Sequence, residues 1–347
     1  MLRSSRTKPV AGLDIEPGAV TAARVSVNGH ITVEQAATAP LAPNVVRDGD
    51  VTDVDAVADA LRELWGANKG LPKDVRVGAA NARIVMRVMD LPPLENPKEL
   101  DAVVRHHAEQ DLPIPLDSAA LDFRPIGTVD TPDGPRLRTV VVAARRDLVE
   151  HLVAAVRSAG LRPVGVDLSA FAMVRALRAD DAPALYLSVS GLTNLAVADG
   201  RGCLFTRVTG GGLEHMVQAL AERAGAPVSE ARGWIMRAGI TGTDAELEDD
   251  LETLATVRTV LVAGVRQIAG EVRSSLDFHQ TQSRGDTALD RVLLTGAAAA
   301  VPGFADTLCT ELGLPVEPRA VDFAADNDLD PARVSVAAGL AVAEVPA

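Results

Sequence analysis

The sequence is poor in aromatic residues, which make up 3% of its 347 positions, whereas hydrophobic residues of all kinds make up 47%. Its core must therefore be built from Val, Leu and Ala, and wholesale disorder is excluded because so much apolar surface is available for burial. A chain of 347 residues suits two domains or one large α/β assembly of subdomains.

Cysteine and positive charge are also scarce. Cys203 and Cys309 are the only cysteines, and without the spacing of a metal site they are expected to be two buried thiols in a reducing cytosol. The formal net charge of -13 argues against a nucleic-acid partner, because phosphate backbones are bound by clustered Lys and Arg. It does not exclude a nucleotide, whose phosphates can be bound by backbone amides at hairpin turns and helix N-termini.

The chain has no long apolar run, since none approaches the ~20 residues that a membrane-spanning helix needs. We therefore expect a cytoplasmic protein without direct membrane insertion, recruited to the inner face of the cell membrane by a partner. The basic start "MLRSSRTKP", residues 1–9, is followed by no signal-peptide core and is expected to be a short disordered tail.

The first ordered stretch, "GLDIEPGAVTAARV", predicts a β-hairpin because apolar residues flank the breakers Pro17 and Gly18. A third strand, "HITVEQAAT", follows. A helix is predicted over "TDVDAVADALRELWGANKG", capped by Thr52 or Asp53 and ended by Gly70, and then a strand over "VRVGAA". This order of elements indicates half of an α/β layer.

The next eighty or so residues have a different order of predicted strands and helices, which indicates a compact α+β insert. A strand ends at a double proline, and a helix follows with Asn96 as N-cap, Pro97 at its first position and Glu99 at the capping-box spacing. Two strands then surround the turn "TPDGP", and a second helix is ended by Gly160. Asp167, further on, is expected to cap the helix that it precedes.

The second half of the chain begins with a larger hairpin, "ALYLSVSGLTNLAVADGRGCLFTRVTGGG". A helix starts at its three glycines, and a largely helical stretch continues to about Arg284. A strand, a turn and a helix then fit "RVLLTGAAAAVPGFADTL", and a last apolar helix fits "ARVSVAAGLAVAEV". Each half thus has a hairpin followed by helix and strand, which predicts two α/β lobes with a cleft between facing hairpins.

Two stretches carry a resemblance to a known family: "DLPPLENPKELDAVVRHHAEQDLPIPLDSAALDFRPI" and "VVVAARRDLVEHLVAAVRSAGLRPVGVDLSAFAMVRAL". They resemble the PilM family of type IV pilus assembly, which belongs with FtsA, Hsp70 and sugar kinases to the actin-like ATPase superfamily. The resemblance extends from Val10 to Val342. It implies an α/β, actin-like or Hsp70-like two-lobed ATPase fold with an inserted small α+β subdomain.

The resemblance also implies a division of the chain. The implied parts are a first-lobe core (10–82), an inserted subdomain of PilM/FtsA type (83–162), first-lobe core again (163–182), a second-lobe core (183–222), a helical subdomain (223–289), second-lobe core again (290–325) and a C-terminal helix returning to the first lobe (326–347).

In this superfamily the two hairpins hold ATP and Mg²⁺, so the resemblance implies a nucleotide site between them. Asp14 matches the aspartate that approaches Mg²⁺, a role that suits a carboxylate beside a hydrated hard cation. The alternative is an Asp that only shapes the turn. The positions implied to bind the cofactor are Asp14, Gly18, Ser188, Ser190, Gly191, Thr193, Asn194, Gly210, Gly211, Gly212, Glu271, Ser275, Gly296, Ala297 and Gly303.

The chain departs from the family pattern at several of these places. Glu16 adds a negative charge where phosphates would lie, and Pro17 removes an amide donor. The second hairpin has Ser188 or Leu187 where an Asp is usual, and Ala297 replaces a glycine. No catalytic residue is therefore assigned, and ATP binding is expected to be degenerate and non-hydrolytic. An ordinary hairpin and a solvated helical face are the alternatives for the second hairpin and for the helix of Glu271.

The function implied by the resemblance is that of a scaffold in type IV pilus or type II secretion-like assembly. Its groove between first lobe and insert would take the N-terminal tail of a PilN-like inner-membrane protein as an extended peptide. A cytoplasmic pilus motor ATPase is a further candidate partner. Two alternatives stay open, an active Mg-ATPase of the actin/Hsp70 class and an FtsA-like filament-forming division protein.

Overall fold

The structure is a computed structural model that describes residues 8–94, 96–132, 134–178, 180–247, 250–282, 289–325 and 327–343. Most of the predicted N-terminal tail (residues 1–7), the end of the predicted helical stretch (283–288) and residues 344–347 lie outside the described residues. Within the described parts, no helix is both long enough and apolar enough to span a bilayer.

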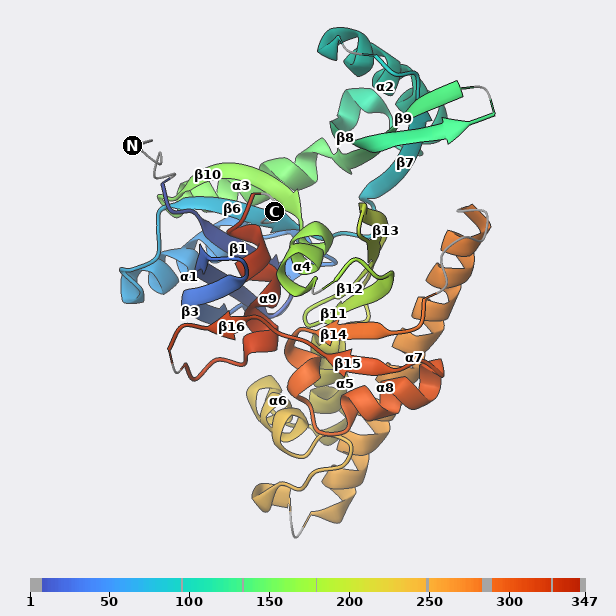
Figure 1. The fold of residues 1–347 in the computed structure, drawn as a ribbon. Coiled ribbons are helices and arrows are strands. Elements are labelled where there is room, and N and C mark those ends of the chain that lie inside the picture. Colours follow the sequence, from blue (N-terminus) through green and yellow to red (C-terminus); the bar gives the residue numbers. More distant parts are fainter. Residues whose placement is uncertain are drawn as a thin grey trace.

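The first lobe is built on a six-stranded sheet of order β10-β6-β1-β2-β3-β16 (Figure 1). The hairpin of β1 and β2 is confirmed as an antiparallel pair, β6 runs parallel to β1, and β10 runs parallel to β6. The strands are β1 (Ala11–Glu16), β2 (Ala19–Val27), β3 (Ile31–Pro40), β6 (Asp74–Ala79), β10 (Arg162–Leu168) and β16 (Asp322–Phe323), with a small pair β4 (Val46–Arg47) and β5 (Asp50–Val51).

Two pairs of helices pack against this sheet. α1 (Val54–Ala67) and α3 (Arg146–Ser158) share one apolar cluster with β1 and β6. α9 (Pro331–Leu340) shares an apolar cluster with β2 and β3, while α4 (Ser169–Leu177) packs on α9 and shares its cluster with strands of the second lobe. α9 packs so closely on β1 that a Cβ at Gly12 would lie 1.8 Å from the Ala337 carbonyl oxygen, so only glycine fits there.

Local sequence signals are mostly confirmed at the ends of these helices. Asp53 caps α1 by accepting a hydrogen bond from the Ala56 amide at 2.9 Å, but the helix ends at Ala67, before Gly70. Gly160 follows α3 with φ +76°, as a helix stop requires. The capping role expected of Asp167 is wrong, because its carboxylate instead pairs with Arg175 within α4.

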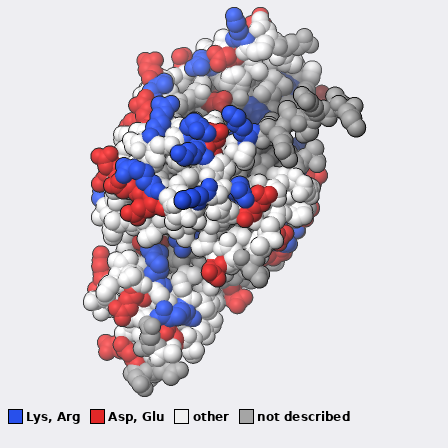
Figure 2. All heavy atoms as spheres, turned by 90° about the vertical axis from the view of Figure 1, so that its left-hand side faces the viewer, with Lys and Arg blue, Asp and Glu red and all other residues white. Residues whose placement is uncertain are grey.

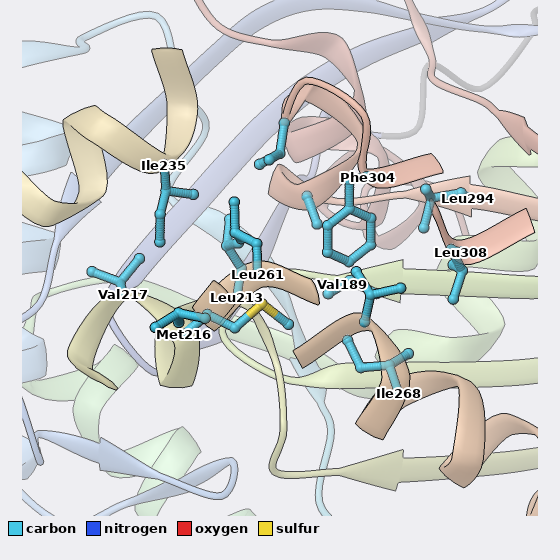
Figure 3. Packing of buried hydrophobic residues seen from close by; sticks show 14 of the residues in the cluster. Val189, Leu213, Met216, Val217, Ile235, Leu261, Ile268, Leu294, Phe304 and Leu308 are labelled. Carbon is cyan, nitrogen blue, oxygen red and sulfur yellow. The ribbon is translucent and has the colours of Figure 1, made fainter. Parts of the chain in front are cut away.

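The second lobe has a five-stranded sheet of order β13-β12-β11-β14-β15. Its core is a cluster of aliphatic side chains around Phe304, which is fully buried between the sheet and the helices (Figure 3). The elements are β11 (Ala184–Val189), β12 (Thr193–Asp199), β13 (Gly202–Thr209), α5 (Leu213–Ala224), α6 (Val228–Arg237), η2 (Ala245–Leu247), α7 (Leu251–Gln282), β14 (Val292–Thr295), η3 (Ala297–Ala300), α8 (Phe304–Leu312) and β15 (Val316–Pro318).

The insert stands apart at the top of Figure 1, with a three-stranded sheet of order β7-β9-β8 and its own apolar cluster around Leu91, Val104 and Val141. Asn96 caps α2 as predicted, since its side chain accepts from the Lys98 amide at 3.0 Å and donates to Glu99 at 3.1 Å. The elements are β7 (Val85–Leu91), α2 (Pro97–Asp111), η1 (Leu116–Ser118), β8 (Ala119–Thr131) and β9 (Gly134–Arg145).

Candidate functional site

The turns of the two hairpins touch directly between the lobes. Glu16 Oε2, at the end of β1, accepts a hydrogen bond from the Gly191 amide in the β11–β12 turn at 3.1 Å. A Cβ at Gly191 would lie 2.4 Å from the Pro17 carbonyl oxygen and 2.8 Å from Glu16 Cβ, so glycine is needed for this approach. The Gly191 amide is a hydrogen-bond donor that a phosphate oxygen could use, and here it donates to the carboxylate of Glu16 instead.

The N-terminus of α5 carries its own carboxylate at the same place. The Glu214 amide donates to the Ser190 carbonyl at 3.3 Å, and its side chain accepts from Arg232 Nη2 at 2.5 Å. A Cβ at Gly18 would lie 2.4 Å from Glu214 Oε2. This helix N-terminus, which favours an anion, thus already faces the side chain of Glu214.

The cavity that remains between the turns has a volume of about 20 Å³, which is room for roughly one water molecule. Pockets for nucleotide-sized ligands have volumes on the order of hundreds of Å³. Its lining residues are Asp14, Glu16, Pro17, Gly18, Ala19, Thr21, Ser190, Gly191, Leu213, Glu214, Arg232, Ala297 and Arg333.

Burial raises the pKa of two carboxyl groups of this cavity, Asp14 and Glu16. Burial raises the pKa of Asp14 to about 6, against the lowering effect of the Ser169 hydroxyl that donates to it at 3.2 Å. Burial and the charge of Asp14 raise the pKa of Glu16 well above its usual value, while the Gly191 amide and Arg333 act in the opposite direction. Burial in turn lowers the pKa of Arg333.

Three other predicted positions lie around the turn after β14. Gly296 adopts φ +85°, and a Cβ there would lie 2.7 Å from the Val189 carbonyl oxygen. The Ala297 amide donates to Ser190 Oγ at 2.9 Å, so this turn is tied to the second hairpin. Gly303, with φ +77°, packs against Thr241 and does not line the cavity.

The remaining predicted residues are spread over the second lobe. Ser188, Thr193 and Asn194 are buried within β11 and β12, and Thr193 Oγ1 donates to the Gly211 carbonyl at 3.2 Å. A Cβ at Gly210 would lie 2.8 Å from Asp48 in the first lobe, and one at Gly212 would lie 2.5 Å from the Ser190 carbonyl oxygen.

Glu271 and Ser275 lie on α7, near the glycines that precede α5. Glu271 Oε1 accepts from Gln267 at 3.1 Å, and its Oε2 is buried without a hydrogen-bond partner among the described residues. Ser275 is buried and donates to the Glu271 carbonyl at 2.6 Å, a bond within its own helix. The Ser275 hydroxyl therefore donates its hydrogen bond within α7.

The structure therefore brings Asp14, Gly18, Ser190, Gly191 and Ala297 together around one cavity. Sequence reasoning missed Glu214, Arg232 and Arg333, which share it. The acid directly after "GGGL" was a usable signal for Glu214, because it stands in the first turn of a helix that was expected to face phosphate. The two arginines come from α6 and α9, and no local pattern marks them.

The residues present do not fit Mg-ATP in this arrangement. Three carboxylates line the cavity between the hairpin turns, Glu16 already accepts from the Gly191 amide, and the cavity holds about 20 Å³. Throughout the described residues there is no group of three or more His, Cys, Asp and Glu side chains arranged to hold a metal ion.

A second site lies where the insert meets the first lobe. A groove of about 210 Å³ is lined along one side by residues 120–124 of β8 and along the other by residues 166–168 of β10, with an apolar floor that includes Val140, Val142 and Phe171. Side chains alternate between the faces of a strand, so five consecutive lining residues mean that the groove follows the strand's edge. Both strands are edge strands of their sheets.

Some backbone amides of β8 and β10 along this groove donate hydrogen bonds to the side chain of the preceding residue. The Phe123 amide donates to Asp122 Oδ1 at 2.9 Å, and the Leu168 amide donates to Asp167 Oδ1 at 2.8 Å. Unpaired strand edges readily accept another extended chain, and local capping of this kind protects them without removing the backbone groups. The groove is therefore chemically suited to an extended apolar peptide.

A comparison with known protein families matches residues 12–324 to the family described as type IV pilus assembly protein PilM. Among solved structures, one chain of a PilM-PilN type IV pilus biogenesis complex is 25% identical, with a TM-score of 0.75 over 96% of this chain and 97% of that one.

More distant structures show the fold alone. The ethanolamine utilization protein EutJ from Carboxydothermus hydrogenoformans is 16% identical, with a TM-score of 0.56 over 98% of this chain and 92% of that one. MreB5 of Spiroplasma citri, solved bound to ADP, is 12% identical, with a TM-score of 0.51 over 96% and 95%. The predicted actin-like α/β fold is thereby confirmed, and the chain belongs to the PilM family of type IV pilus assembly proteins.

Proposed function

We propose that this chain is an actin-fold scaffold of pilus assembly that binds the cytoplasmic N-terminal tail of a PilN-like inner-membrane protein. The observation that carries the proposal is the groove between β8 and β10, together with the likeness to a chain solved in a complex with PilN. Through such a tail the protein would be held at the inner face of the membrane. A cytoplasmic motor ATPase as a further partner stays a prediction from the sequence.

In this proposal the tail binds as an extra strand along the groove. The free backbone groups of β8 or β10 supply hydrogen bonds, and alternate side chains of the tail enter the apolar floor formed by Val140, Val142 and Phe171.

The test is a calorimetric titration of the protein with a synthetic PilN-like tail. Val142→Asp places a charge on the apolar floor of the groove and should weaken binding on the order of 100-fold or more. Ile114→Asp is the control: it packs on the core of the insert and lines a different groove, formed by residues within 82–85, 113–118 and 145–150. Equal affinity in both variants, or loss in the control alone, would contradict the choice of groove.

We further propose that the interlobe cleft is a degenerate, non-hydrolytic nucleotide site in which Glu16 stands where a phosphate would bind. Nucleotide must then displace the Glu16–Gly191 hydrogen bond and separate the two turns. No water-activating base is assigned, because the second hairpin supplies Ser188 or Leu187 where a carboxylate would be required.

A thermal-shift titration with Mg-ATP checks this second proposal. The wild-type protein should show a shift near zero, and Glu16→Gly, which removes the carboxylate and keeps the turn, should gain a measurable one. Thr52→Ser, an exposed and conservative change in the first lobe, serves as control. A large shift in the wild type, or ATP turnover that Asp14→Asn removes, would instead support an active ATPase.

A further inference from the structure

One end of the first-lobe sheet gathers basic side chains from segments far apart in the chain. Ala11 in β1 and Pro163 in β10 both lie opposite Val75 in β6, so the residues just before these parallel strands lie at the same end. The Arg162 amide donates to the Lys73 carbonyl at 2.8 Å. The connections α1–β6 and α3–β10 and the start of β1 therefore converge here.

We call this region the basic end and define it by five exposed residues: Lys8, Lys69, Lys73, Arg157 and Arg162. Four of them, all but Arg162, make no ion pair with any described residue. Two acids beside this region are already paired, Asp74 with Arg162 and Glu34 with Arg24 at 3.0 Å. Figure 2 looks at this side of the molecule and shows Lys and Arg side chains gathered over the first lobe, with Asp and Glu side chains among and beside them.

Exposed apolar side chains lie at the same end. Val164 is 51% exposed, two residues after Arg162 on the edge strand β10. Val27 is 39% exposed at the end of β2, which is antiparallel to β1 and therefore finishes where β1 begins. Unpaired cations beside exposed aliphatic groups are the combination that an anionic lipid–water interface accommodates.

A cluster of unpaired cations is unexpected in a chain of net charge -13, whose other surfaces repel anions. We propose that the basic end binds the headgroups of anionic phospholipids and so sets the orientation of the protein against a membrane. A nucleic acid, the other common polyanion, is less suited because it would meet the strongly negative remainder of the molecule along its length.

The position of the groove agrees with this orientation. β10 runs from Arg162 in the basic end to Leu168 in the groove, a distance of about 20 Å for a strand of that length. A membrane-anchored partner whose tail lies in the groove would hold the basic end close to the bilayer. This step alone rests on the proposed function, because the charge of the basic end does not depend on it.

The experiment is co-sedimentation of the full chain with vesicles of phosphatidylcholine, alone or mixed with an equal amount of phosphatidylglycerol. Binding should be confined to the anionic vesicles and should fall as salt is raised. The triple variant Lys69→Glu, Lys73→Glu and Arg157→Glu should bind them at least about 100-fold more weakly, because each lost basic residue accounts for about fivefold and the added carboxylates are repelled.

A matched variant, Lys98→Glu with Arg207→Glu and Arg223→Glu, changes the net charge equally at exposed positions elsewhere and should bind like the wild type. Equal sedimentation with both vesicle types, equal loss in both triple variants, or equal affinity for double-stranded DNA through the same residues would overturn the inference. The tail titration on the same variants separates the two proposals, since the basic end can fail while tail binding persists.

Discussion

The interlobe cavity and the groove beside the insert are both formed where two parts of the chain meet at strand ends or edges. In the cavity, side chains of both lobes fill the space. Glu16 accepts a hydrogen bond from the Gly191 amide, and Glu214 accepts one from Arg232. In the groove, residues of the two edge strands β8 and β10 line a space of about 210 Å³ together with largely apolar side chains. The same fold thus carries one contact satisfied from within and one left open to a partner.

This difference has a physical cause. Burying polar groups is favourable only when each finds a partner, and in the cavity Glu16 accepts from Gly191 across the lobes while Glu214 pairs with Arg232 within the second lobe. The groove has few charges to satisfy, and its unpaired backbone groups remain available. We therefore expect substitutions in the cavity to change stability, and substitutions in the groove to change binding.

The largest expected effect comes from adding atoms to the tightest contact. Gly191→Val would place a Cβ 2.4 Å from the Pro17 carbonyl oxygen and 2.8 Å from Glu16 Cβ, and should lower the free energy of unfolding by about 3 kcal/mol or more. Ala120→Val, which adds two methyl groups at a partly buried position lining the groove, should cost less than about 1 kcal/mol. Urea denaturation measures both, and similar losses would remove the contrast.

A smaller effect is expected from the buried carboxyl of Asp14. Its pKa of about 6 lies above the unfolded value near 3.8, so the folded state binds more protons and stability falls as pH rises through this interval. Asp14→Asn should therefore raise the free energy of unfolding by about 2 kcal/mol at pH 8 and have little effect at pH 4.

The groove provides the control for this pH dependence. Asp122→Asn changes an exposed carboxylate, and its effect should stay within about 0.5 kcal/mol at both pH values. Denaturation of both variants across the pH range checks the pair. An Asp14→Asn protein that is less stable than the wild type at pH 8 would show that the carboxylate is needed for closure.

The smallest effect is expected from ion pairs. Glu214→Gln leaves Arg232 with a neutral partner in the cavity and should cost about 1 kcal/mol. Asp90→Asn, in the more exposed pair with Arg138 on the insert, should cost less than about 0.5 kcal/mol. Thermal unfolding at low and high salt distinguishes them, because only the exposed pair should weaken further with salt.

Much of the fold could be predicted because its signals are local. Asp53 and Asn96 lie next to the helices that they cap, and the hairpin turn at Pro17 and Gly18 needs only its neighbours. Asp167 was assigned wrongly for the same reason: its partner Arg175 lies two turns further along the helix, beyond the reach of a capping rule.

The candidate site was predictable only in part. The sequence placed Asp14 and Gly191 in facing hairpins, and it showed that Glu16 and Pro17 are unusual residues for a phosphate turn. It could not show that Glu16 accepts from Gly191, because the two residues come together only when the lobes close. Arg333 reaches the cavity from α9, near the other end of the chain.

By itself, then, the sequence determined the elements, the family and the departures from a nucleotide-binding pattern, since each depends on residues close together in the chain. Tertiary structure decided which groups are buried together, and with them the pKa of Asp14, the volume between the hairpins and the free edges of β8 and β10. Burial and edge pairing are properties of distant segments brought into contact, and no local pattern contains them.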